Sequence, residues 1–291
     1  MTSTSPVIYI SVIFVLITLE ANPTLGQDSS GFAEYLFRQK DYFRAITVFK
    51  GLLFESKEKA ASYRYSRQIA EAYRLSGKYK SSIYFYSESL RNVSKPHEHV
   101  KSLIGLGLNY YHMKTIPLAK NYFQKAADVD TTGHAELFLG LMAMEKMNWP
   151  EAQIMFKNTL NKSKNPEVLK AANLLSRKAG SGKRLPKKSP ALAFIMSSIL
   201  PGSGQIYSGH FFDGVQAFTY IGAFSLATYS AYRYDRDVKD SDGFLLLSAA
   251  ITGIFYLSNV FGAHQTAKFR NVRIRQDFMA EAQKVVFEVP F

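Results

Sequence analysis

The chain contains no cysteine and only one tryptophan among its 291 residues. The lack of cysteine excludes disulfides, thiolate metal sites and a cysteine nucleophile. Acidic residues are few as well, because 23 Asp and Glu stand against 36 Lys and Arg and leave a net charge of +13. No basic and aromatic motif of a nucleic-acid-binding module is present. We therefore expect no nucleic acid partner, and we assign the positive charge to a solvated surface and to the flanks of membrane segments.

The sequence also lacks a recognisable catalytic or metal-binding cluster. His97 and His99 stand two positions apart, so on a helix they could not share a metal, and we expect them in a solvated loop after Pro96. The acidic residues of 235–243 miss the spacing of a calcium loop and alternate with Arg and Lys. The Gly-Lys pair at 182–183 lacks the other residues of a phosphate-binding loop. We therefore expect no enzyme activity, no cofactor and no metal.

Residues 32–160 repeat one short pattern four times. Each copy has a small residue followed four positions later by an aromatic one: Ala45 and Phe49, Ser82 and Tyr86, Ala119 and Phe123, Ala152 and Phe156. The small residues are 37, 37 and 33 positions apart, and a period near 34 is typical of arrays of helical hairpins. A second small residue lies upstream in each copy and would let the paired helices approach closely: Ala33, Ala70, Gly107 and Gly140. The turns are expected near Lys40, Gly77, Lys114 and Met147.

This pattern resembles the tetratricopeptide repeat over about half of the chain. It departs from that repeat where Ser82 replaces the usual Ala and where the usual turn glycine appears only as Gly77. The resemblance implies an all-α solenoid at residues 31–179, with about four hairpins and a capping helix, whose groove binds a protein or peptide. Aromatic and Arg side chains would carry most of the binding energy. Repeat spacing predicts that the following residues face outward: Tyr35, Arg38, Arg67, Arg74 and Asn109.

The array needs a cap at its end, and Asn165 and Pro166 predict the start of one further helix. We expect this capping helix to end near Ala179. Residues 180–189 then form a basic linker, which we place at a lipid headgroup surface. At the other end of the chain, residues 1–26 form a signal peptide or an uncleaved N-terminal anchor. Their apolar core is short for a membrane span, and no Lys or Arg precedes it.

Residues 190–263 contain three apolar stretches, which predict a small membrane module. The second stretch, residues 211–232, and the third, residues 244–263, are long enough to cross a bilayer. The first, residues 191–200, spans only if the helix continues to Tyr207; otherwise it is a re-entrant half-helix.

A glycine-rich run joins the first two stretches, with these residues: Pro201, Gly202, Gly204, Gln205, Tyr207 and Gly209, followed by Gly214. The run resembles a signature of small bacterial membrane modules of uncharacterised function, and it implies a compact helical hairpin. We expect Gln205 to have a structural role by hydrogen bonding to the broken backbone of the turn. The tail, residues 264–291, is basic at first, continues as a helix to about Lys284 and ends in a strand-like segment, residues 285–291.

Charge gives conflicting signals on orientation. The linker and the tail are basic, which favours the cytoplasm, whereas a cleaved signal peptide would export the repeats. Two crossings would place the linker, the tail and the repeats together in the cytoplasm. Three crossings would place the repeats and the polar loop outside and the tail inside. We expect three crossings of a bacterial inner membrane, with the repeats in the periplasm.

The function expected from these features is that of a membrane-anchored scaffold for protein–protein interaction at the bacterial envelope. The alternative is a small membrane transport or lipid-handling module that the repeats recruit. The expected partners are a protein or peptide in the groove and the lipid bilayer. The sequence leaves the oligomeric state open.

Overall fold

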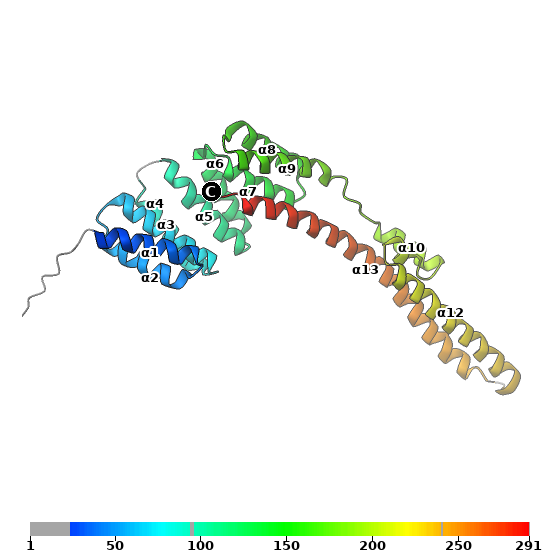
Figure 1. The fold of residues 1–291 in the computed structure, drawn as a ribbon. Coiled ribbons are helices and arrows are strands. Elements are labelled where there is room, and N and C mark those ends of the chain that lie inside the picture. Colours follow the sequence, from blue (N-terminus) through cyan, green and yellow to red (C-terminus); the bar gives the residue numbers. More distant parts are fainter. Residues whose placement is uncertain (1–23, 94–95, 240, 291) are drawn as a thin grey trace, which may run out of the picture. The chain divides into compact units, whose positions relative to one another are not determined.

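The computed structural model describes residues 24–93, 96–239 and 241–290, and within these ranges every regular element is helical. The all-α expectation is therefore confirmed. The chain divides into two compact units, Met1–Tyr122 and Phe123–Phe291 (Figure 1). The expected signal or anchor core, residues 6–19, lies outside the described residues.

The first unit is built from successive antiparallel helices, each packed against the next as far as α5. Its helices are α1 (Thr24–Arg38), α2 (Tyr42–Glu55), α3 (Lys59–Leu75), α4 (Tyr79–Arg91), α5 (Pro96–His112) and the first part of α6 (Ile116–Val129). Helix α1 begins before residue 31, where we expected the repeats to begin. His97 and His99 lie within α5 and not in a loop, because Pro96 occupies the first position of the helix, where its missing N–H costs nothing.

The second unit contains one further hairpin, a capping helix and the apolar module. Its helices are α7 (His134–Glu145), α8 (Trp149–Lys162), α9 (Pro166–Gly182), α10 (Pro190–Ile199), α11 (Ser203–Tyr207), α12 (Phe211–Tyr234), the π-helical turn η1 (Asp235–Lys239) and α13 (Gly243–Glu288). The predicted start of the capping helix is confirmed, because the Asn165 side chain accepts a hydrogen bond from the Glu167 N–H at 2.9 Å and Pro166 opens α9.

The four expected hairpin turns share one backbone conformation. Each contains a residue with positive φ: Lys40 (61°), Gly77 (75°), Lys114 (61°) and Met147 (59°). In each turn this residue donates its N–H to the carbonyl three positions earlier, and the next residue donates to the carbonyl five positions earlier. Such a pair of bonds satisfies the last carbonyls of a helix. The predicted turn positions are confirmed.

The small and aromatic residues of the repeat pattern pack against each other within the hairpins. Three pairs, each 16 positions apart, show this packing: Ala33 with Phe49, Ala70 with Tyr86, and Gly140 with Phe156. A Cβ added at Gly140 would overlap the Phe156 ring, so a small residue is required there. The predicted register of these hairpins is therefore confirmed.

Two helices extend further than the sequence indicated. Helix α9 continues past Ala179 to Gly182, because Gly182 packs so closely on Trp149 that a Cβ there would overlap the indole ring. Helix α13 runs without interruption for 46 residues and crosses the expected boundary between membrane module and tail. Residues 285–288 are therefore helical and not strand-like, because Val286 is buried in packing against the repeat region.

Candidate functional site

The five residues expected to face outward differ in their exposure. Tyr35 and Arg38 are exposed on α1, and Arg67 and Arg74 are half-buried on α3. Asn109 does not face outward, because it is fully buried on α5. The expectation for Asn109 is therefore wrong.

Asn109 instead links neighbouring helices. Its Nδ2 donates to Ser82 Oγ at 2.9 Å and to the Gly105 carbonyl at 2.8 Å. Ser82 Oγ in turn donates to the Ala70 carbonyl at 2.7 Å. This chain of bonds joins α5 to α4 and α3, and it explains why a serine stands where the repeat usually has alanine. A polar residue at a position that normally packs as alanine was the available sequence signal for it.

A partly buried ionic cluster lies between α3 and α4. Glu71 accepts hydrogen bonds from the Arg74 guanidinium and from the Tyr86 hydroxyl. Burial favours the neutral form of Glu71, but the hydrogen bond and charge of Arg74, together with the Tyr86 hydroxyl, outweigh burial and lower the pKa of this carboxyl. Arg74 is thus held by an internal partner, and its side chain is only 11% exposed.

Arg67 and Lys101 add two further cations where α3 meets α5. Burial lowers the pKa of the Lys101 ammonium, and the nearby charge of Arg67 lowers it further. Glu71 offsets part of this charge, but it is one carboxylate against the three cations Arg67, Arg74 and Lys101, and a further anion nearby would be stabilised. The α3–α5 surface can therefore attract a carboxylate of a partner, and Lys101 is a residue that our sequence reasoning missed.

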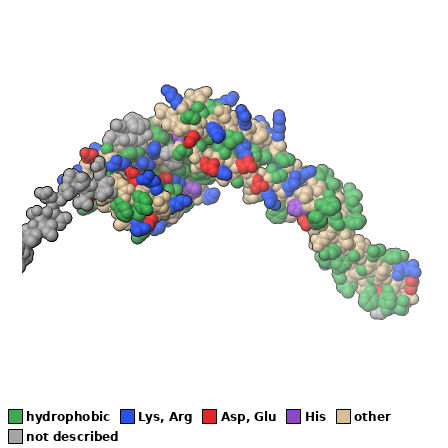
Figure 2. Space-filling model, viewed as in Figure 1, with side chains coloured by type: hydrophobic (Ala, Val, Ile, Leu, Met, Phe, Trp, Pro, Cys, Tyr) green, Lys and Arg blue, Asp and Glu red, His purple; other side chains and the backbone are tan. Residues whose placement is uncertain are grey.

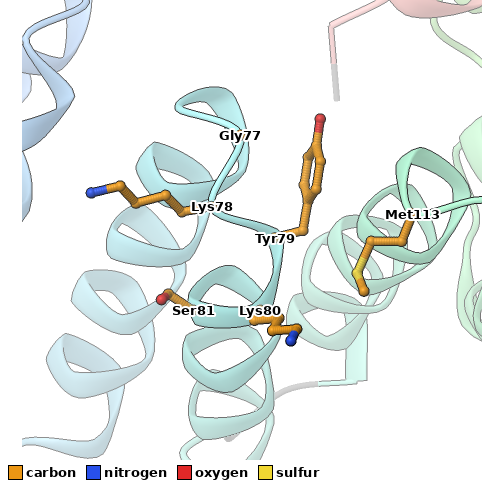
Figure 3. A pocket seen from close by; sticks show the side chains of 6 residues that line it. All are labelled: Gly77, Lys78, Tyr79, Lys80, Ser81 and Met113. Atoms are coloured by element: carbon orange, nitrogen blue, oxygen red, sulfur yellow. The ribbon is translucent and has the colours of Figure 1, made fainter.

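A shallow open depression of about 340 Å³ lies beside the α3–α4 turn. Figure 3 shows Tyr79 between this turn and Met113, which directly follows the end of α5. The Tyr79 ring stacks on the His112 ring with centroids 5.4 Å apart. Burial lowers the pKa of His112, and the charges of Arg74 and Lys114 lower it further. The depression offers a surface for contact, and no group of three His, Asp or Glu that could hold a metal occurs in the described part of the chain.

The end of α13 packs against the last hairpin of the repeat region. Every residue of α7 from His134 to Met144 is buried, because α8 covers one side and α13 packs on another. Two ring contacts hold the apolar part of this interface: Phe138 with Phe287 at 5.8 Å and Trp149 with Phe278 at 5.8 Å. Figure 1 shows the red C-terminal end of α13 beside α7.

Polar contacts fix the register of this docked segment. Gln283 Nε2 donates to a Glu145 carboxylate oxygen at 2.9 Å, and Arg275 donates to the Glu145 carbonyl at 2.6 Å. His134 Nε2 lies 2.8 Å from the Pro290 carbonyl, and Lys178 pairs with Glu281. The chain therefore covers α7 with its own C-terminal helix. Sequence reasoning missed this contact, because no local pattern connects segments about 150 positions apart.

The glycine-rich run forms a tight reversal between α10 and α11. Gly202 has φ of 85°, and a Cβ there would overlap the Gly214 carbonyl, while a Cβ at Gly204 would overlap the Ala193 carbonyl. These positions need glycine because backbones touch. Pro201 stands two positions after Ile199, the last residue of α10, where a proline cannot continue the helix.

Hydrogen bonds hold this reversal against α13. The Gly202 N–H donates to Asn259 Oδ1 at 3.2 Å, and the Gly204 N–H donates to Ser197 Oγ at 3.0 Å. Gln205 bonds to both receiving residues, since its Nε2 donates to Asn259 Oδ1 at 2.9 Å and its Oε1 accepts from Ser197 Oγ at 2.9 Å. We expected the Gln205 side chain to hydrogen-bond to the broken backbone of the turn. It bonds instead to Asn259 and Ser197, the two residues whose side chains accept from that backbone.

Helices α10 and α11 therefore run down and back along α13. The Tyr207 hydroxyl accepts from the Ser189 N–H at 3.2 Å, so α11 ends beside the start of α10. The Gly209 backbone, with φ of 88°, lies against the Arg270 guanidinium. The first apolar stretch is thus a short helix that turns back, and it does not continue through the glycine-rich run.

This path returns the linker and the tail to the same end of the module. The Lys188 N–H donates to Asn271 Oδ1 and Asn271 Nδ2 donates to the Lys188 carbonyl, both at 2.8 Å. The tail then packs on α7 of the same unit. Three crossings would put the linker and the tail on opposite sides of a bilayer, so the three-crossing arrangement that we expected is incompatible with these contacts.

The two long helices of the module form an antiparallel pair. The Phe224 and Phe255 rings stack at 4.4 Å, and the Thr228 and Thr252 hydroxyls are 2.8 Å apart. Helix α13 is the one helix in the described ranges that is long and apolar enough by itself to indicate a membrane span. Helix α12, which we also expected to span, has 24 residues but is less apolar.

No protein-family model matches this chain, and no curated protein matches it. The resemblances to tetratricopeptide repeats and to small bacterial membrane modules therefore rest on the residues of this chain alone.

Proposed function

We propose that the protein is a membrane-anchored scaffold whose helical repeats, of tetratricopeptide type, hold a protein or peptide partner. The observation that carries this proposal is the docking of α13 on α7. A first helix of a hairpin here accepts a helical segment through aromatic rings and a few polar bonds. The first helices α1 and α3 present comparable residues, including exposed Tyr35 and Arg38.

The charges of this surface favour an acidic partner segment. Arg38 is exposed, Arg67 is half-buried, and Lys101 lies close to Arg67. Glu71 is already engaged by Arg74 and Tyr86. A partner with carboxylates flanking an apolar or aromatic residue would complement these cations and Tyr35.

The C-terminal module supplies the anchor. Figure 2 shows apolar side chains over the α12–α13 hairpin and charged ones at its far tip. The exposed apolar residues of this hairpin include Phe212, Phe218, Leu226, Leu246 and Ile254. Since α12 pairs with α13 along this stretch, we propose that both helices cross the bilayer and that α10 and α11 form a re-entrant pair.

Two crossings place the linker, the tail and the last hairpin on one side of the membrane. That end of the module is strongly basic, and positive residues favour the cytoplasm. We propose the cytoplasmic face of a bacterial inner membrane for this end, which replaces the periplasmic placement expected from the N-terminal apolar run.

Single-cysteine labelling tests the side directly, because the chain has no cysteine of its own. Cysteine is placed at the exposed positions Lys57, Gln276 and Val238 and probed in spheroplasts with a membrane-impermeant maleimide, before and after permeabilisation. We expect labelling of Val238→Cys alone before permeabilisation. If only Lys57→Cys and Gln276→Cys were labelled, the orientation would be opposite to the one that we propose. If one of these two variants were labelled and the other were not, the repeats and the tail would lie on different sides and the same-side arrangement would be overturned.

Partner binding is tested by site-specific photo-crosslinking in cells. The photoreactive residue replaces Tyr35 or Arg38, and the control replaces Phe54, which is 93% exposed on α2. We expect defined adducts from the first two positions, weakened by Arg67→Glu, and none from Phe54. Equal adducts at all three positions, or none at Tyr35 and Arg38, would contradict the scaffold.

The alternative, a transport or lipid-handling module, draws support from the buried polar residues Ser197, Gln205 and Asn259. Their hydrogen bonds, however, go to each other and to the backbone of the reversal. That arrangement favours a structural role, so we keep the scaffold as the proposal.

A further inference from the structure

We propose that the linker and α13 together form one binding site for anionic phospholipid headgroups, the basic collar. We define the basic collar as Lys183, Arg184, Lys187 and Lys188 of the linker with Lys268, Arg270 and Arg273 of α13. Neither residues 183–188 nor residues 268–275 contain an Asp or Glu. The site does not depend on the proposed scaffold function, only on the attachment of the module to a bilayer.

The fold joins two segments that are about 80 positions apart in the sequence. The reciprocal pair of bonds between Lys188 and Asn271, both at 2.8 Å, sets the end of the linker directly against α13. Arg270 reaches the Ser208 carbonyl at 3.4 Å, and the Lys188 ammonium lies 4.4 Å from the centre of the Tyr207 ring. These contacts hold the end of the linker beside the cationic part of α13, and the other linker cations precede Lys188 by one to five positions.

Most of these cations are available to a ligand. Lys183, Arg184 and Lys187 are exposed in the linker, and Lys268 and Arg273 are exposed on α13. Their exposure while surrounded by like charges is costly unless counter-charge is supplied. An array of phosphate groups supplies that counter-charge.

The membrane-proximal end of the basic collar lies at the level of a headgroup layer, and the α13 cations beyond Lys268 lie within about 8 Å above it, which is comparable to the Debye length. Lys268 lies five positions beyond Ala263, where the apolar stretch of α13 ends, so the helix has risen about 7 to 8 Å. The headgroup region of one leaflet is about 5 to 8 Å thick. The first residues of α12, Phe211 and Phe212, are exposed near this level, as expected for aromatic residues at a membrane interface.

The opposite end of the module lacks such a surplus of positive charge. There Arg233 is paired with Asp237 at 3.2 Å, and Asp235 and Asp242 offset the remaining cations. A soluble polyanion would not require the apolar surface that adjoins the basic collar. The combination of one-sided charge and adjoining apolar surface favours the anionic leaflet of a bilayer over nucleic acid or an acidic protein.

The test uses the full-length protein in a neutral detergent, titrated with fluorescent phosphatidylglycerol or phosphatidylcholine. The collar variant replaces Lys183, Arg184, Lys268 and Arg273 with Gln. A charge-matched control replaces the exposed cations Lys57, Lys59, Lys164 and Arg236 with Gln. We expect the wild type and the control to prefer phosphatidylglycerol by about tenfold or more, and the collar variant to lose most of this preference.

Two further arms test whether the site is single and specific for lipid. Asn271→Ala removes the bonds that join the segments without changing the charge, and we expect it to reduce the preference by several-fold. Circular dichroism checks that each variant stays helical.

Equal binding of both lipids, or a preference that persists in the collar variant, would overturn the proposal. So would displacement of the lipid by millimolar inorganic phosphate, or tighter collar-dependent binding of a single-stranded oligonucleotide. These outcomes do not depend on the crosslinking at Tyr35, so a failure of the lipid site can be told apart from a failure of the proposed scaffold function.

Discussion

Individual residues in the four hairpin turns carry a conformational cost that glycine would avoid. Lys40, Lys114 and Met147 adopt positive φ although each has a side chain, and only Gly77 has the residue best suited to that conformation. A left-handed residue with a Cβ costs about 1 to 2 kcal/mol. Replacement by glycine removes this cost but adds about 0.5 to 1 kcal/mol of chain entropy to the unfolded state.

We expect Lys114→Gly to raise the free energy of unfolding by about 0.5 to 1 kcal/mol, and Gly77→Lys to lower it by about 1 kcal/mol. Denaturant midpoints followed by circular dichroism measure both changes. Gly51→Ala is the control, since a Cβ there meets nothing within 4 Å and alanine favours a helix interior. If Lys114→Gly destabilised the protein while Gly51→Ala stabilised it, the assigned cost of the turn would be wrong.

His112 is a single residue that makes the free energy of unfolding depend on pH. Its pKa is lowered in the folded protein by burial and by the charges of Arg74 and Lys114, so the unfolded chain binds the proton more readily. The contribution of His112 to the free energy of unfolding is fully present above its unfolded pKa near 6.5. It is lost as the pH falls through the lower pKa of the folded protein. We expect His112→Phe, which keeps the stack on Tyr79, to flatten the stability curve between about pH 5 and 7.

The lowered pKa of Glu71 affects stability in a separate, more acidic pH range. The contribution of this carboxylate to the free energy of unfolding is present above its usual pKa of 4.5 and is lost as the pH falls through its lower pKa in the folded protein. A loss of stability near pH 6 that persisted in His112→Phe would show that another group is responsible.

The elements of this fold were predictable to different degrees. Hairpin turns and the pairs of small and aromatic residues could be placed from the sequence, because each depends on residues within 20 positions of each other. Asn109 could not, because its partner Ser82 lies in the preceding hairpin. The helical state of residues 285–288 could not either, because packing on α7 overrides the strand preference of valine and phenylalanine. Gly182 is helical for a similar reason, because it packs on the Trp149 ring.

The docked end of α13 can be tested with a matched pair of alanines. Ala282 is fully buried and Ala280 is exposed. We expect Ala282→Leu to cost about 1 to 3 kcal/mol by overpacking and to speed amide hydrogen exchange in α7. Ala280→Leu should change neither. Unaltered exchange in both variants would mean that α13 does not protect α7.

The reversal between α10 and α11 offers a second matched pair. A Cβ at Gly204 would overlap the Ala193 carbonyl, whereas one at Gly222 in α12 meets nothing within 4 Å. We expect Gly204→Ala to lower the thermal midpoint of the detergent-solubilised protein and Gly222→Ala to leave it within a degree or two, since only the first displaces backbone. Equal midpoints would contradict the close packing assigned to the reversal.

At the scale of the whole molecule, the order of segments matters more than any one contact. The linker enters the module and the tail leaves it at the same end, as the Lys188–Asn271 pair shows. The two crossings that we propose agree with that geometry, because they leave the linker and the tail on one side. The sequence favoured three crossings, because a cleaved signal peptide would export the repeats while the basic tail favours the cytoplasm, and because a short apolar helix that turns back has the same composition as one that crosses.

Helix α13 continues from Ala263, at the end of its apolar stretch, to the buried Met279 without a break in its hydrogen bonding. These sixteen residues correspond to a rise of about 24 Å. In the membrane-anchored arrangement that we propose, this rigid helix sets both the height of the last hairpin above the lipid and the direction in which that hairpin faces. One added residue would rotate the docked surface by about 100°. The distance between the proposed scaffold and the bilayer would thus be set by the number of residues in α13, and the neighbouring linker would only have to span the same distance.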